Sequence, residues 1–180
     1  MKLFIIRHGE TNYNKMGKTA GQVFNHPLND KGIEQAKSIS KNLPSEINAI
    51  FSSPLKRARQ TAEIINKNYN LKIGLRDELM ERNYGSLSGK TWEDMAKESG
   101  IPNLKEIDYA QKYDYHRFGG ESINDVKSRL LNFIEYLNTN YKNGKVVIVT
   151  HGGILKIMHN EFPQKERPEI GNATIHEFEI

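Results

Sequence analysis

The chain opens with Leu3-Phe4-Ile5-Ile6-Arg7-His8-Gly9, in which four apolar residues are followed by two basic residues and a glycine. The apolar run predicts a buried strand. The pattern returns near the other end, where Val146-Val147-Ile148-Val149 is followed by Thr150-His151-Gly152-Gly153. Open α/β sheets bind ligands at the carboxyl ends of their parallel strands. One histidine in such a place is more often a structural polar residue, but two of them predict a shared anion-binding site.

Helix and strand patterns alternate between these two strands. One expected helix runs from its cap Asp30 to Leu43, and another from Gly152 to about His159. Three more are expected to start at Ser53-Pro54, with the proline at the first helical position, at the cap Thr91, and at Ser122, which forms a capping box with Asp125. Further strands are expected at 47–51, 71–75 and, as an edge strand, 174–180. This order predicts an α/β fold, a three-layer α/β/α sandwich whose mainly parallel sheet has helices on both faces.

The domain organisation follows from length and regularity. A chain of 180 residues suits one domain, and no repeat or composition shift divides it. The least regular stretch is 99–120, with Pro102 and the pair Gly119-Gly120. We therefore expect a single domain of residues 1–180 with a lid-like insertion over the site at about 91–120.

Composition narrows the class of protein. Without cysteine the chain has no disulfide, no thiolate chemistry and no cysteine-type zinc site. The net charge of +4 comes from scattered lysines and fits an anionic small substrate better than nucleic acid, because no aromatic-basic motif of a known nucleic-acid module is present. No apolar run approaches the roughly 18 residues of a membrane span, and no signal-peptide pattern precedes the first strand. We expect a cytoplasmic protein with no membrane partner.

Four segments, in this order along the chain, carry a family resemblance. They are Arg7-His8-Gly9-Glu10-Thr11 with Asn14, the stretch from Ser52-Ser53-Pro54-Leu55-Lys56-Arg57 to Ala62, Glu81 with Gly85 and Gly89, and Thr150-His151-Gly152-Gly153. Together they resemble the histidine phosphatase superfamily, which includes the cofactor-dependent phosphoglycerate mutases. The resemblance implies a phosphoglycerate mutase-like fold and a metal-independent phosphomonoesterase that acts on a small phosphorylated metabolite through a phosphohistidine intermediate.

The resemblance implies a role for each of five catalytic candidates. His8 is the expected nucleophile, since a neutral imidazole can take up a phosphoryl group. Arg7, Arg57 and His151 are expected to surround the phosphate oxygens, because guanidinium forks suit the charge that phosphoryl transfer spreads over three oxygens. Glu81 is the expected general acid, which protonates the leaving alkoxide.

The resemblance also implies a second set of residues, which bind the substrate: Asn14, Gly21, Arg82, Tyr84 and Gly152. The cations of the pocket take the place of magnesium, so we expect no cofactor and no metal, and no histidine pair has the spacing of metal ligands beside a carboxylate. The expected partner is a small phosphorylated substrate or inorganic phosphate. The sequence gives no oligomeric state.

Other residues near these motifs receive weaker interpretations. Glu10 and Glu78 compete with Glu81 for the acid role, but we interpret Glu10 as a structural group of the first loop and Glu78 as a surface carboxylate. His26 is expected at the pocket mouth. Substrate specificity is expected to depend on Phe24, Arg82, Tyr84 and Trp92, together with residues 99–118.

Two further functions stay open beside the phosphatase. Glu81-Arg82-Asn83-Tyr84-Gly85 resembles the mutase form of the third motif. However, residues 89–121 hold no adjacent arginine pair for a second anionic group, and only Lys105, Lys112 and Arg117 could replace it. The loops therefore favour a phosphatase over a phosphoglycerate mutase. A non-catalytic anion-binding domain would be expected to lack some catalytic candidates, and all of them are present.

Overall fold

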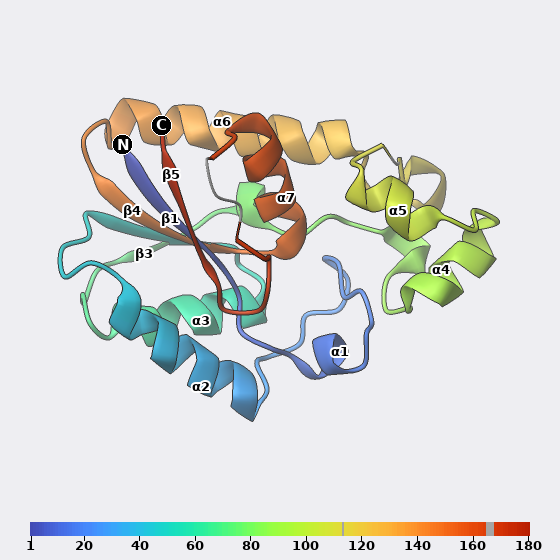
Figure 1. Ribbon diagram of the computed structural model, residues 1–180, viewed down its shortest axis with the longest axis horizontal. Helices are drawn as coiled ribbons and strands as arrows, with labels where there is room; N and C mark the ends of the chain where they lie inside the picture. The colour runs from blue at the N-terminus through green and yellow to red at the C-terminus, as the bar shows by residue number, and fades with distance from the viewer. Residues whose placement is uncertain (113, 165–167) are drawn as a thin grey trace.

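The computed structural model describes residues 1–112, 114–164 and 168–180. Its strands are β1 (Lys2–Arg7), β2 (Ala49–Ser52), β3 (Ile73–Leu75), β4 (Lys145–Thr150) and β5 (Ile175–Glu179). Its α-helices are α1 (Asn12–Lys15), α2 (Asp30–Ile39), α3 (Lys56–Asn66), α4 (Trp92–Ser99), α5 (Leu104–Tyr109), α6 (Ile123–Asn140) and α7 (Gly152–Glu161). Helices α2 and α3 cover one face of the sheet and α6 and α7 the other (Figure 1). The predicted three-layer sandwich is confirmed.

The sheet has the strand order β3-β2-β4-β1-β5. Strand β1 pairs in parallel with β4, in a register that runs from Lys2 opposite Lys145 to Arg7 opposite Thr150. Strand β5 is the predicted edge strand, and it pairs antiparallel with β1. Because β1 and β4 end at the same level, the residues that follow them, His8 and His151, leave the sheet side by side.

The apolar runs are explained by burial on both faces of the sheet. In β1, Leu3 and Ile5 belong to a core cluster with residues of α6 and α7, whereas Phe4 and Ile6 belong to a second cluster with residues of α2 and α3. All four side chains are 3% exposed or less. A strand covered on both faces reads as a continuous apolar run rather than as an alternation.

Helix starts confirm some predicted caps and correct others. The Thr91 hydroxyl caps α4, and Ser122 and Asp125 form the predicted capping box of α6. Helix α2 is capped by Asn29 rather than by Asp30. The prediction for Pro54 is wrong, because α3 begins only at Lys56. The reason lies in Ser53, whose hydroxyl accepts a hydrogen bond from the Leu55 N–H and keeps the chain in a turn before the helix.

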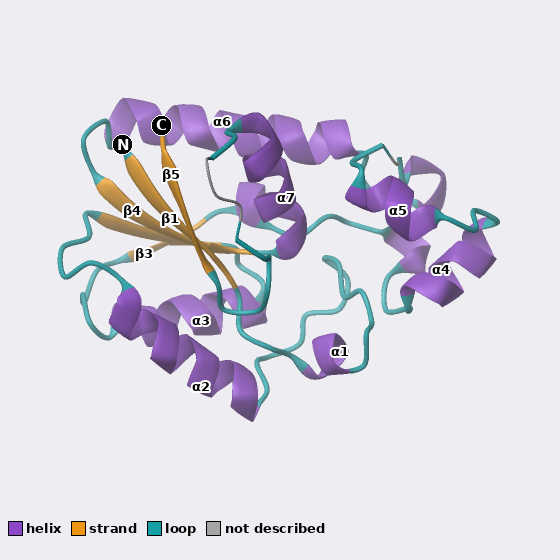
Figure 2. Cartoon of the chain, viewed as in Figure 1, coloured by secondary structure: helices purple, strands orange, loops and turns teal. Residues whose placement is uncertain are grey.

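The segment expected to form an insertion lies beside the sandwich rather than on the sheet (Figure 2). Helices α4 and α5 contribute to a third apolar cluster, which contains Tyr84, Leu87, Met95, Leu104 and Tyr115. This cluster fastens the segment to the loop that carries Glu81. None of the helices in the described parts of the chain is long and apolar enough to cross a membrane.

Candidate active site

A cavity of about 680 Å³ opens where β1 and β4 end. Eight of the ten residues predicted for the site line it, namely Arg7, His8, Asn14, Gly21, Arg57, Glu81, Tyr84 and Gly152. His151 is fully buried against His8, and the two ring centroids lie 5.1 Å apart. The remaining residue, Arg82, lies elsewhere. The fold thus brings four separate sequence motifs to one place.

His8 is held in one tautomer by its own backbone. The Nδ1 atom lies 2.7 Å from the carbonyl oxygen of Gly9, and because a carbonyl only accepts hydrogen bonds, we assign the ring proton to Nδ1. The Nε2 atom then carries the lone pair, and it accepts a 3.2 Å hydrogen bond from Nε of Arg57. Burial, with Arg57 and Arg7 nearby, holds the pKa of His8 well below its usual range. The imidazole is therefore neutral and nucleophilic at Nε2.

Close packing against α2 explains why the residue after His8 is a glycine. A Cβ atom at Gly9 would lie 2.4 Å from the carbonyl oxygen of Gly32 in α2, so any side chain would push the loop away from the helix. The Gly9 N–H donates a 3.1 Å hydrogen bond to the Thr61 hydroxyl of α3. These two contacts fix the backbone whose carbonyl orients His8.

Two guanidinium groups flank the nucleophile. Arg57 is buried and donates from Nη2 to the carbonyl of Gly21 at 2.8 Å and from Nη1 to that of Phe24 at 3.2 Å. Burial lowers the pKa of Arg57 to about 10, so it remains a cation at neutral pH. Arg7 donates to the carbonyl of Ile170 at 2.9 Å, and its Nε is buried with no partner among the described residues. Neither cation is paired with a carboxylate of the described chain, which leaves both charges available to an anion.

His151 supplies a further donor beside His8. Its Nε2 lies 2.9 Å from the Ser53 hydroxyl. Because no other acceptor for the proton of that hydroxyl is found in the described part of the chain, we assign this proton to the bond with Nε2, so that the ring proton of His151 lies on Nδ1. Nδ1 is buried with no partner in the described part of the chain. Burial, with Arg57 and His8 close by, holds the pKa of His151 well below its usual range.

Glu81 lines the cavity next to the first turn of α7. Its Oε2 accepts the N–H of Gly153 at 3.2 Å, and its Oε1 accepts the N–H of Arg82 at 2.9 Å. A Cβ atom at Gly153 would lie 2.2 Å from Oε1 of Glu81. The carboxylate therefore sits in the space that a side chain at Gly153 would fill.

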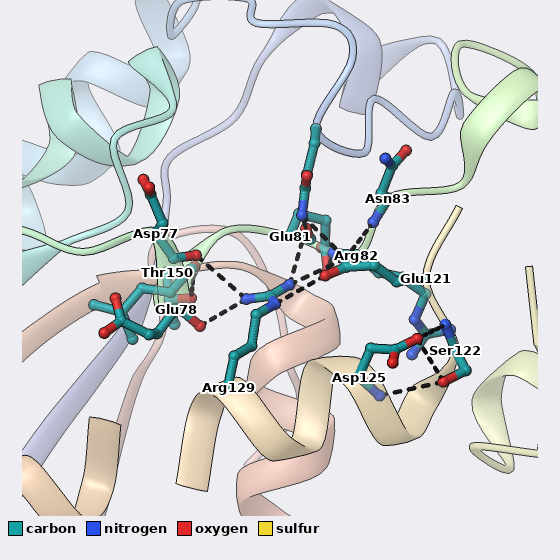
Figure 3. Close-up of polar contacts among 12 residues, drawn as sticks. Asp77, Glu78, Glu81, Arg82, Asn83, Glu121, Ser122, Asp125, Arg129 and Thr150 are labelled. Atoms are coloured by element: carbon teal, nitrogen blue, oxygen red, sulfur yellow. Dashed lines mark hydrogen bonds and ion pairs between the residues drawn. The ribbon is translucent and has the colours of Figure 1, made fainter. Parts of the chain in front are cut away.

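The loop that carries Glu81 is held from behind by α6, as Figure 3 shows. The guanidinium of Arg129 donates to the carbonyls of Glu78 at 2.6 Å and Glu81 at 3.3 Å, and to the Glu121 carboxylate at 3.0 Å. Glu121 also accepts the N–H of Asn83 at 2.8 Å. This network fixes the backbone on both sides of Glu81 while leaving its carboxylate in the cavity.

The first loop places two of the predicted substrate-binding residues. Asn14 closes a capping box on α1, in which its side-chain oxygen accepts the N–H of Thr11 at 3.0 Å. That oxygen also accepts from the Asn172 side chain at 3.3 Å. Gly21 contributes a carbonyl that holds Arg57 and has a positive φ of 55°. Across the cavity, burial raises the pKa of Tyr84 well above its usual value, so its phenol remains protonated.

The structure corrects the prediction for Arg82. Its side chain is 2% exposed, forms an ion pair with Asp108 of α5 and does not line the cavity. Asp108 also accepts a hydrogen bond from the Tyr115 hydroxyl at 2.8 Å. The side chain is drawn away from the cavity because α5 offers a buried carboxylate, and no sequence motif identified that partner. Arg82 thus links the Glu81 loop to the segment expected as an insertion.

The weaker interpretations have mixed outcomes. Glu10 is structural, since its carboxylate accepts from Asn29 at 3.0 Å and Lys31 at 2.9 Å. His26 stacks on Tyr13 and is absent from the cavity lining, contrary to the expectation. Of the three possible stand-ins for a paired-arginine motif, Lys105 lines the cavity, whereas Lys112 and Arg117 do not.

Sequence reasoning missed several polar groups of the cavity lining, among them Lys18, Lys156 and Asn172. For Lys156 a signal was present, because it follows Gly152 by four residues and so shares its helix face. Lys18 and Asn172 lie in loops, where no periodicity identifies a site. Within the described residues, no group of three or more histidine, aspartate or glutamate side chains is arranged to hold a metal ion.

Fold and site together define an α/β protein that presents a neutral histidine and several cations to an anion at the carboxyl edge of its sheet. The chain belongs to the histidine phosphatase superfamily (branch 1), whose sequence model matches residues 3–180. The resemblance seen in the motifs is thereby confirmed over nearly the whole chain.

Individual relatives include both phosphatases and a mutase. The metal-independent phosphoserine phosphatase of Arabidopsis thaliana is 32% identical over 91% of this chain and 69% of its own. The mycobacterial glucosyl-3-phosphoglycerate phosphatase has a TM-score of 0.83 and 25% identity, covering 98% of this chain and 91% of its own. A phosphoglycerate mutase from Thermus thermophilus has a TM-score of 0.74 and 32% identity, covering 91% of this chain and 85% of its own.

Proposed function

We propose that this protein is a metal-independent phosphatase that hydrolyses small phosphomonoesters through a phosphohistidine on Nε2 of His8. The observation that carries the proposal is the neutral His8 ring, whose proton is fixed on Nδ1 and whose Nε2 faces Arg57 in a cavity that also holds Glu81. An anion there meets Arg7 and Arg57, two cations with no carboxylate partner among the described residues, and His151 is buried against His8.

In the first half-reaction, the Nε2 lone pair of His8 attacks phosphorus as the bond to the ester oxygen breaks. The hydrogen bond from Arg57 Nε to Nε2 is exchanged for bonds to the phosphoryl oxygens, which both arginines can contact in bidentate fashion. Protonated Glu81 gives its proton to the leaving alkoxide, so an alcohol departs. The charge on the three phosphoryl oxygens is stabilised by Arg7, Arg57 and the Nδ1–H of His151.

In the second half-reaction, water attacks the phosphohistidine and the N–P bond breaks. Glu81, now a carboxylate, takes a proton from that water and is again ready to act as an acid. The products are inorganic phosphate and the neutral His8. No step requires a metal ion, because side-chain cations neutralise the phosphoryl charge.

The test compares phosphate release by the natural chain, the His8→Ala variant and the control variant His116→Ala. His116 is exposed and lies outside the cavity lining, so its loss is expected to leave turnover intact. We expect His8→Ala to abolish both the release of phosphate from p-nitrophenyl phosphate and an acid-labile phosphoenzyme. Activity is expected to persist in a chelator and to be highest at mildly acidic pH. Normal turnover by the His8→Ala variant would refute the proposal, and no hydrolysis by the natural chain would favour a non-catalytic anion-binding domain.

A phosphoglycerate mutase is the second candidate, and the likeness to the Thermus thermophilus mutase favours it. A mutase returns the phosphoryl group from His8 to a second hydroxyl instead of to water. Incubation with 3-phosphoglycerate and traces of the 2,3-bisphosphate separates the two activities. A phosphatase releases phosphate, whereas rapid isomerisation without phosphate release identifies a mutase.

We also place substrate selection in the residues of segment 91–120 that line the cavity. Trp92, Lys105 and Tyr109 of this segment line the cavity. We propose that the segment acts as a lid-like wall of a single domain. A cytoplasmic location stays a prediction, which cell fractionation would check.

A further inference from the structure

The loop that leads into β5, residues 170–174, holds the start of the phosphate site although the proposed hydrolysis gives it no chemical step. The carbonyl of Ile170 accepts the 2.9 Å hydrogen bond from the Arg7 guanidinium. The N–H of Ala173 donates to the carbonyl of Arg7 at 3.0 Å and to that of His8 at 3.2 Å. The loop therefore contacts a phosphate-binding side chain and the backbone of the nucleophile.

One side chain of this loop, Asn172, joins two separate parts of the site. Its Nδ2 donates to the carbonyl of His8 at 3.1 Å and to Oδ1 of Asn14 at 3.3 Å. An amide nitrogen carries two protons, so it makes both bonds at once. Asn172 and Asn14 both line the cavity. The bridge thus connects the end of β1 to α1 at the cavity wall.

The bridge bears on how Asn14 faces the cavity. Oδ1 of Asn14 also accepts the N–H and the hydroxyl of Thr11, each at 3.0 Å. With three donors around Oδ1, Nδ2 is the part of the Asn14 amide that is left for a phosphate oxygen. Helix α1 has four residues and none of them is buried, so no apolar core fixes where Asn14 lies relative to His8.

The backbone of the loop is strained next to this bridge. Ala173 has a φ of 51°, the left-handed region that is unfavourable for a residue with a Cβ atom. Such a conformation persists only where the surrounding contacts enforce it, and it is concentrated at functional sites. Here the contacts of Asn172 and Ala173 converge on one carbonyl, that of His8. The strain therefore indicates a functional constraint on the loop.

A buried polar chain anchors the far end of the loop to α7. The Thr174 hydroxyl donates its one proton to the carbonyl of Gly171 at 2.9 Å, so it accepts from Nε2 of His176 at 2.9 Å. Nδ1 of His176 in turn accepts from Nε2 of His159 at 2.8 Å. His176 is fully buried and His159 is 5% exposed. These contacts hold the loop from the side away from the cavity.

We infer that Asn172 is a positioning residue of the phosphate site, which holds the Asn14 amide at a fixed place relative to the His8 backbone. The chain from Thr174 to His159 keeps the loop in the conformation that this task needs. The inference rests on the proposed function, because Asn172 acts through Asn14 on the phosphoryl group that His8 attacks. Its loss should therefore matter only while Asn14 is present.

A double-mutant cycle separates this role from a general loss of structure. The variants are Asn172→Ala, Asn14→Ala and the chain with both changes, and the control is Asn138→Ala. Asn138 is an exposed residue of α6 outside the cavity lining. For each protein we measure kcat/KM for p-nitrophenyl phosphate, the affinity for inorganic phosphate by calorimetry, and the free energy of unfolding by urea denaturation.

We expect Asn172→Ala to lower kcat/KM and the affinity for phosphate by about 10-fold each, the upper range for one neutral hydrogen bond. In the Asn14→Ala background the same change should cost about 2-fold or less, because the amide that Asn172 positions is gone. The His8 carbonyl keeps its bond from the Ala173 N–H in all of these proteins. Asn138→Ala should match the natural chain.

A second cycle tests the anchor without changing the cavity lining. Thr174→Val removes the hydroxyl between Gly171 and His176, and it should reproduce the loss of Asn172→Ala, again only while Asn14 is present. Thr174→Ser keeps the hydroxyl and should restore most of the activity. This cycle also tests the inference if Asn172→Ala does not fold, which the urea denaturation reveals.

Two results overturn the inference. One is a loss of the same size with and without Asn14, which shows that the loop only supports the fold. The other is an Asn172→Ala variant with unchanged kcat/KM and phosphate affinity beside an impaired Asn14→Ala. If the natural chain binds phosphate but hydrolyses no ester, the proposed function fails, and the phosphate affinities of the cycle still decide whether Asn172 positions Asn14.

Discussion

Replacing Gly153 with alanine tests whether Glu81 acts as the acid from its observed position. The new Cβ would lie 2.2 Å from Oε1 of Glu81, whereas ordinary contacts begin at 3.4 Å. The carboxylate oxygen must therefore move by the difference between 3.4 and 2.2 Å, which is 1.2 Å. It is the end of a flexible side chain, so the displacement costs little stability. A misplacement of about 1 Å in a catalytic group lowers the rate by about 100-fold, or about 2.7 kcal/mol in the barrier.

The effect should depend on the leaving group. An alkyl phosphate such as glycerol 3-phosphate needs a proton on its departing oxygen, whereas p-nitrophenolate leaves readily without one. We expect Gly153→Ala to lower kcat/KM for glycerol 3-phosphate by about 100-fold and to change that for p-nitrophenyl phosphate by roughly 5-fold or less. The free energy of unfolding should change by only about 1 kcal/mol, since alanine favours the helix while the Gly153–Glu81 hydrogen bond weakens.

Two comparators make the test specific. Glu81→Gln is expected to reproduce the dependence on the leaving group. In Gly152→Ala the new Cβ meets Nε of Arg7 at 3.6 Å, an ordinary contact, so any change should fall equally on both substrates. An equal loss on both esters in Gly153→Ala, or no loss on the alkyl ester, would refute Glu81 as the acid.

Two further predictions concern stability. Burial beside the arginines lowers the pKa of His8 and His151, so the unfolded chain takes up protons below about pH 6.5 that the folded chain does not, and stability falls as the pH falls. Urea denaturation at pH 7.5 and 5.5 measures how much unfolding free energy is lost between these two pH values. In His8→Asn this loss should be smaller than in the natural chain by about 1.4 kcal/mol. An unchanged loss would contradict a neutral buried His8. Asp108→Asn leaves the buried Arg82 charge without its partner and should cost about 3 kcal/mol in unfolding free energy. Adding Arg82→Met should recover part of that loss in the same assay, and a further drop would refute the pairing.

The sequence predicted best what depends on continuous local patterns. Because β1 and β4 are buried on both faces, they appear in the sequence as continuous apolar runs. The parallel pairing of such strands placed His8 and His151 together. Side-chain caps at Thr91 and Ser122 were equally readable, because capping depends on residues three positions apart. The helix start predicted at Pro54 was wrong, because the Ser53 hydroxyl, which contacts His151, keeps the chain in a turn before α3.

What could not be predicted depends on partners that meet only in the folded chain. Arg82 follows the acid directly, yet its side chain is committed to Asp108, which lies far along the sequence in an irregular segment. Arg129, which holds the Glu81 loop together with Glu121, belongs to no motif identified from the sequence alone.

The ion pair between Arg82 and Asp108 constrains how the specificity of this scaffold can be changed. Arg129 of α6 belongs to the common framework, so the Glu81 loop keeps that support when residues 91–120 are exchanged. Asp108, in contrast, is removed with the exchanged segment, and the buried guanidinium of Arg82 then has no ion-pair partner directly beside Glu81. A chimera that borrows this wall from another phosphatase must therefore bring a carboxylate for Arg82, or replace Arg82 with an apolar residue, before its new substrate preference can be measured.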